Sequence, residues 1–174
     1  MRRTPPLLDA GALTPVGRYV AATTPVGRRS ADDLFSGKHR DEATKLIERI
    51  MAAEAPIPLA LLARRVGAYF GIGRVTARVA EQVRALALPI VSCGDEPDVY
   101  WRLDQSPAEW PQVRVAGEAA ESRRVIDDVP LVELAGAVLE VLLSHPQRVL
   151  SKPQLLEKLY DWSGSEPEGN ALEV

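Results

Sequence analysis

Residues 41–103 read DEATKLIERIMAAEAPIPLALLARRVGAYFGIGRVTARVAEQVRALALPIVSCGDEPDVYWRL, and the order of patterns in this stretch decides the fold. Apolar residues recur at helical spacing in three segments, which are residues 41–53, 59–70 and 74–87. Pro56 and Pro58 separate the first two segments, because the residue before a proline is pushed towards extended geometry. Gly71 ends the second segment. The sequence therefore predicts helix, extended link, helix, tight turn and helix.

A β-hairpin is expected directly after the third helix. Residues 90–93 and 99–103 favour strands, and the intervening Gly-Asp-Glu-Pro-Asp is typical of a turn. This order of elements is that of a winged helix-turn-helix. We therefore expect a mainly α fold with a small β-hairpin, in which a winged helix-turn-helix-like domain occupies residues 41–104. An incomplete second helical unit, also of winged-helix type, is expected to follow it.

Arginines gather on the last two helices of the expected domain. Five arginines stand against one glutamate over residues 64–84, and clustered cations are what attraction to nucleic-acid phosphates requires. The third helix of a winged helix-turn-helix is the one that can enter a major groove. The candidate contacts to double-stranded DNA are Arg64, Arg65, Arg74, Arg78 and Arg84. The alternative stays open that these arginines only form the solvated face of amphipathic helices.

The segments on either side of this domain look like connectors. Residues 1–40 contain four prolines and the sequence TPVGR twice, so we expect a disordered, basic Pro/Gly linker. Its arginines could touch phosphates, or the linker could simply be solvated. Residues 105–130 predict an acidic connector, with Trp110 half-buried against the preceding domain.

Helical patterns return after Pro130, and Ser151 with Gln154 matches a capping box. Three segments resemble the output domain of OmpR/PhoB-type response regulators in order and spacing; they are RVLSKPQL (148–155), KLYDW (158–162) and NALEV (170–174). The resemblance covers residues 138–174 and implies part of a winged-helix DNA-binding domain from bacterial two-component transcription regulation. In that family the chain continues through a recognition helix and a wing. We therefore expect residues 131–174 to be a partial unit lacking both.

The middle of the chain resembles a second family. The segments that carry the resemblance are LIERI (46–50), AEAPI (53–57), LLARRV (61–66), GRV (73–75) and VYW (99–101). They look like a domain of unknown function near the C-terminal end of large bacterial superfamily I helicase-like proteins, with residues 40–142 covered. The resemblance implies an accessory module in nucleic-acid processing, without a catalytic residue of its own.

Composition points away from catalysis. The 174 residues carry a formal net charge of -3 and contain one cysteine and two histidines. A disulfide-built scaffold is thereby excluded, and too few soft ligands remain for a usual zinc site. We expect Cys93 to be a small buried residue, and structural roles for His39 and His145. No signal peptide or membrane helix is expected, so the protein should be cytoplasmic, with no enzymatic activity, metal or cofactor.

Two functional hypotheses follow. The first is a non-catalytic DNA-binding winged-helix protein, in which a helicase-associated module is joined to a partial response-regulator output domain. The alternative is a protein–protein docking module, or a truncated gene product without independent DNA binding. The alternative predicts an exposed apolar patch near Trp110 or in the C-terminal unit. The expected partners are DNA, a helicase-like protein, and a second copy of the chain through the incomplete C-terminal unit.

Overall fold

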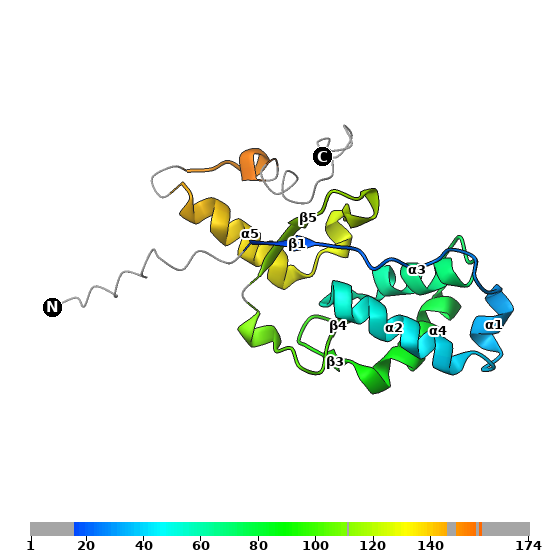
Figure 1. The fold of residues 1–174 in the computed structure, drawn as a ribbon. Coiled ribbons are helices and arrows are strands. Elements are labelled where there is room, and N and C mark those ends of the chain that lie inside the picture. The colour runs from blue at the N-terminus through cyan, green and yellow to red at the C-terminus, as the bar shows by residue number, and fades with distance from the viewer. Residues whose placement is uncertain (1–15, 111, 146–148, 156, 158–174) are drawn as a thin grey trace.

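The computed structural model describes residues 16–110, 112–145, 149–155 and 157 (Figure 1). This part of the chain is mainly α-helical with two small sheets. The helices are α1 (Ala31–Phe35), α2 (Arg40–Glu54), α3 (Leu59–Tyr69), α4 (Ala77–Ala87) and α5 (Leu131–Leu143). The strands are β1 (Val16–Tyr19), β2 (Ile57–Pro58), β3 (Ser92–Cys93), β4 (Val99–Trp101) and β5 (Val113–Ala116). None of the helices in the described ranges is long and apolar enough to cross a membrane.

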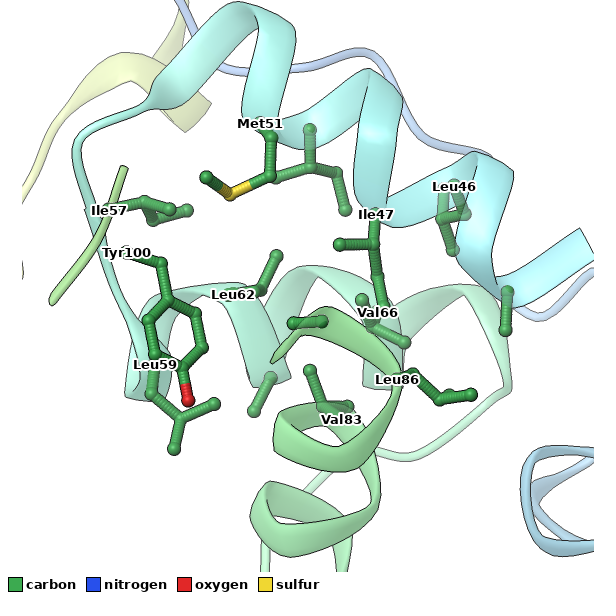
Figure 2. Packing of buried hydrophobic residues seen from close by; sticks show 14 of the residues in the cluster. Leu46, Ile47, Met51, Ile57, Leu59, Leu62, Val66, Val83, Leu86 and Tyr100 are labelled. Carbon is green, nitrogen blue, oxygen red and sulfur yellow. The ribbon is translucent and has the colours of Figure 1, made fainter. Parts of the chain in front are cut away.

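Helices α2, α3 and α4 pack around one hydrophobic core (Figure 2). Each helix contributes apolar residues three or four positions apart, such as Ile47 and Ile50 from α2, Leu62 and Val66 from α3, and Val83 from α4. These five side chains are completely buried. Burial of one such side chain contributes about 1.5–3 kcal/mol, so the three helical periodicities read from the sequence account for the main stabilisation of this unit.

A three-stranded antiparallel sheet closes one side of the helices, in the order β2-β4-β3. Ile57 pairs with Tyr100, and Ser92 pairs with Trp101. Strand β3 is shorter than expected because a 3₁₀ turn with Pro89 in its first turn occupies Leu88–Ile90. Cys93 is exposed, which corrects the expectation of a buried thiol. The reason is that β3 is the edge strand of the sheet, so no neighbouring strand covers the outer side of Cys93.

The third helix begins later than its apolar periodicity predicts. Thr76 is the N-cap of α4, and its side chain accepts a hydrogen bond from the Val79 N–H at 3.4 Å. A threonine in this place satisfies an N–H that would otherwise lack a partner. Arg74 therefore lies in the turn before α4 rather than on the helix.

The expectation of a disordered linker over residues 1–40 is wrong for its described part. Residues 16–19 form β1, which pairs in parallel with β5, and residues 31–35 form α1. The Tyr19 side chain is buried. The acidic connector likewise supplies β5 and two buried arginines, Arg114 and Arg124. Pairing between segments about 100 residues apart leaves no local periodicity, which is why the sequence suggested two connectors. Residues 1–15 lie outside the described residues.

Helix α5 starts directly after Pro130, which is its N-cap, and contacts β5. The expected capping box is present: the Gln154 side chain accepts from the Ser151 N–H at 3.0 Å, and the Ser151 hydroxyl accepts from the Gln154 N–H at 3.5 Å. Residues 152–155 are helical. The KLYDW and NALEV segments lie outside the described residues.

Candidate nucleic-acid interface

Three of the five candidate arginines are already engaged by carboxylates of the protein. Arg64 pairs with Asp128, and Arg65 Nε lies 3.3 Å from the buried carboxylate of Glu54. Arg84 pairs with Asp98 at 2.6 Å, and the hydrogen bond to this carboxylate raises the pKa of Arg84. These three guanidinium groups therefore serve internal contacts, and phosphate would have to compete with carboxylates for them.

Arg74 and Arg78 are different, because both are exposed and neither forms an ion pair within the described ranges. The Arg78 guanidinium lies over the Phe35 ring, 4.4 Å from its centroid. Such a cation–π contact orients the side chain without neutralising its charge. The positive charge at the start of α4 is thus fixed in place and still available to an anion.

The segment before α1 brings a third arginine, which also forms no ion pair within the described ranges, to the turn between α3 and α4. The N–H of Gly27 donates to Ala68 O at 2.8 Å, and that of Arg29 to Tyr69 O at 3.1 Å, so this segment lies along the C-terminal end of α3. In Figure 1 it is the blue chain that passes α3 on its way to α1. Arg28 is exposed on this segment. We call Arg28, Arg74 and Arg78 the basic end.

Arg28 belongs to the second TPVGR copy, and no local pattern places this copy beside the end of the second expected helix. The docking depends on close backbone approach at Gly71, which has a φ of +67° and lies where an added Cβ would be 3.4 Å from Arg29 O. A glycine in the left-handed region is a local signal. Only the tertiary fold determines that the segment around Gly27 and Arg29 approaches this glycine.

The hairpin at the other end of α4 is acidic. A groove of about 420 Å³ lies between α3, α4 and the hairpin, and it carries Glu81, Glu96, Asp98 and Asp127. Arg84 is the one cation of the lining, and it is paired with Asp98. Phosphates would be repelled there. An anion is therefore favoured at the start of α4 and disfavoured at the hairpin.

The histidines make structural contacts. His39 lies between two carboxylates, 3.6 Å from Asp33 and 3.3 Å from Glu42. His145 Nδ1 lies 2.9 Å from Val141 O at the end of α5. Trp110 is half-buried, as expected, with its ring edge against Trp101. In the part of the chain that the structure describes, no group of three or more His, Cys, Asp or Glu could hold a metal ion.

Comparison with known families identifies one segment of the chain. Residues 32–81 match the family model "Protein of unknown function (DUF3320)". The matched segment runs from α1 into α4 and includes Arg74 and Arg78. The match supports the part of the sequence resemblance that concerns a domain of unknown function. No curated protein and no solved structure matches the chain.

Proposed function

We propose that α2, α3, α4 and the β2-β4-β3 sheet form a winged helix-turn-helix that binds double-stranded DNA without catalysing a reaction. The observation that carries the proposal is the basic end, where Arg28, Arg74 and Arg78 lie around the turn between α3 and α4 and form no ion pair among the described residues. The element order supports the fold. The strand after α2 pairs with the last hairpin strand, which gives the sheet order β2-β4-β3.

Contacts to phosphate dominate in this proposal, and base readout is weak. Arg74 and Arg78 are charge contacts, whereas the other exposed positions of α4 include Ala77, Glu81 and Ala85. Alanines offer no hydrogen bonds to base edges, and direct readout depends on such bonds. Three neutralised phosphates would give a slope of about −3 in a plot of log K against log salt.

Sequence resemblances provide the biological setting of the proposal. The match at residues 32–81 is compatible with an accessory module of a helicase-like protein in the cytoplasm. The resemblance of residues 138–174 to OmpR/PhoB-type output domains suggests that this module is joined to part of a transcription regulator.

Fluorescence anisotropy with a labelled duplex, measured over a range of NaCl concentrations, tests the proposal. We expect Arg74→Glu and Arg78→Glu each to weaken binding on all sequences alike and to lower the salt slope by about one. Arg123→Glu is the matched control, since Arg123 is exposed and lies outside the basic end. Undetectable binding at low salt, salt-insensitive binding, or an equal loss in the control would refute the proposal.

Protein docking is a second candidate because α5 exposes several leucines. The fractional exposure is 63% at Leu131, 50% at Leu139, 47% at Leu142 and 48% at Leu143. The only charged residues of this helix are Glu133, which is buried, and Glu140, which is half-buried. An exposed helical face without charge is typical of an interaction surface. We propose that this face takes part in self-association or binds a helicase-like protein.

A further inference from the structure

A second hollow lies beside the basic end, between the start of α2 and the C-terminal end of α3. Its volume is about 420 Å³. Lys38, Lys45 and Arg49 contribute three cations to the lining, and Leu46 and Tyr69 contribute buried surface. Neither the DUF3320 match nor the basic end accounts for this cationic hollow.

The charge balance of the hollow favours an anion. Glu42 also lines it, but Arg29 binds this carboxylate through Nε at 3.1 Å and Nη2 at 2.9 Å. The Tyr69 hydroxyl donates to the same carboxylate. Together these hydrogen bonds lower the pKa of Glu42 to about 2. Glu42 is thus a compensated anion, and Asp41 alone remains to oppose the three cations of the lining.

The Arg49 side chain is held in place by the segment before α1. Its Nη2 donates to Thr23 O at 2.9 Å, which leaves the other guanidinium N–H groups for a ligand. Lys38 and Lys45 are exposed and form no ion pair within the described ranges. One oriented guanidinium and two mobile ammonium groups are a suitable donor set for phosphate oxygens.

We propose that this hollow, which we call the α2 phosphate site, binds a phosphate group through Lys38, Lys45 and Arg49. The chemistry is the same for a phosphodiester of nucleic acid and for a free polyphosphate. The segment from Arg28 to Lys38 joins the site to the basic end. Tyr69 lines the hollow and its carbonyl accepts from the N–H of Arg29, the residue after Arg28, so a DNA backbone that contacts Arg28 has a second cationic site nearby. Binding of the DNA backbone at this site rests on the proposed function, whereas binding of a phosphate group does not.

The experiment uses the full chain labelled with ¹⁵N and titrated with inorganic tripolyphosphate. We expect amide shifts over residues 38–49 and at Tyr69. Lys45→Glu should weaken the binding at least tenfold. Arg40→Glu is the matched control, because Arg40 is exposed on the same helix but does not line the hollow, and its affinity should stay within threefold of the unmodified chain. The proposed site is refuted if these amide shifts are absent, or if Lys45→Glu and Arg40→Glu lose the same amount of affinity for tripolyphosphate.

A parallel titration with duplex DNA separates the two sources of phosphate. If Lys45→Glu weakens the binding of both tripolyphosphate and duplex DNA, the site binds the DNA backbone. If the variant weakens the binding of tripolyphosphate alone, the site binds a free phosphate compound. If the chain binds tripolyphosphate but no DNA, the proposed function fails and the site stands. If the chain binds DNA through the basic end while tripolyphosphate produces no shifts, the proposed function stands and the site fails.

Discussion

Three buried charges link the two sheets of the molecule. Glu133 accepts hydrogen bonds from Arg114 Nε at 3.1 Å and from Arg124 Nη2 at 2.9 Å. Arg114 also donates to the carbonyls of Glu54, Ala55 and Pro56, at the turn between α2 and β2. Burial alone would raise the pKa of Glu133, but the hydrogen bonds from both arginines outweigh it and the pKa is lowered. Each charge is therefore compensated inside the protein.

Glu133→Gln should reduce the free energy of unfolding by about 3–5 kcal/mol, because it leaves two arginines buried without their anion. Urea denaturation at pH 7 measures this loss. Glu118→Gln is the control, since its ion pair with Arg18 is exposed and should contribute less than about 1 kcal/mol. A loss in Glu133→Gln no larger than in the control would contradict the structural role given to this cluster.

The same pair of variants has a pH signature. The lowered pKa of Glu133 means that its stabilisation is fully present above the unfolded carboxyl pKa of about 4.3 and is lost as the pH falls towards the folded value. Replacement by glutamine should therefore flatten the dependence of stability on pH below about 4.3.

At the scale of elements, helices and strands differ in how far local sequence predicts them. The ends of α2 and α3 lie within one residue of the expected 41–53 and 59–70, because helical periodicity is carried by residues three and four apart. The pairing of β1 with β5 joins residues far apart in the chain, so no local periodicity predicts it. What holds that pair is long-range: the buried Tyr19 hydroxyl donates to Glu54 of α2, and the Tyr19 ring lies 4.0 Å from the Arg124 guanidinium.

Gly117→Ala should destabilise the β1–β5 pair. An added Cβ would lie 2.7 Å from Tyr19 O and 3.1 Å from Ser122 Oγ, so backbone would have to move. Overpacking of this kind costs about 1–3 kcal/mol, which thermal or urea unfolding can measure. The control is Gly73→Ala, where no atom lies within 4 Å of the added Cβ and a change within about 0.5 kcal/mol is expected. Equal stability of the two variants would show that this close approach is not maintained in solution.

At the scale of the whole molecule, the net charge of -3 conceals a separation of charge. Arg28, Arg74 and Arg78 lie around the turn between α3 and α4, whereas the groove beside the hairpin carries Glu81, Glu96 and Asp98. The exposed face of α5 carries neither sign. The described surface therefore offers distinct regions for an anion and for an apolar partner, so the proposed binding of DNA and the proposed docking of protein need not compete.

Leu139→Glu should abolish self-association through α5, because a charge in an apolar contact must be desolvated. Sedimentation velocity over a range of protein concentrations measures the association, and duplex binding should be unchanged. The comparison variant is Leu103→Glu, which changes an exposed leucine outside α5. A concentration-dependent association that both variants retain would assign the contact to another surface.

The sequence by itself determined the three core helices and the hairpin, since their signals are carried by residues close together in the chain. It also placed Arg74 and Arg78 on the third helix, which is right for Arg78, whereas Arg74 lies in the turn before α4. Only the tertiary structure decided which arginines keep a free charge. Asp128 reaches Arg64 and Glu54 reaches Arg65, whereas Arg28 comes to the basic end from a segment that looked like a linker. The physical reason is that neutralisation of a charge depends on distance in space, and local patterns contain no information about it.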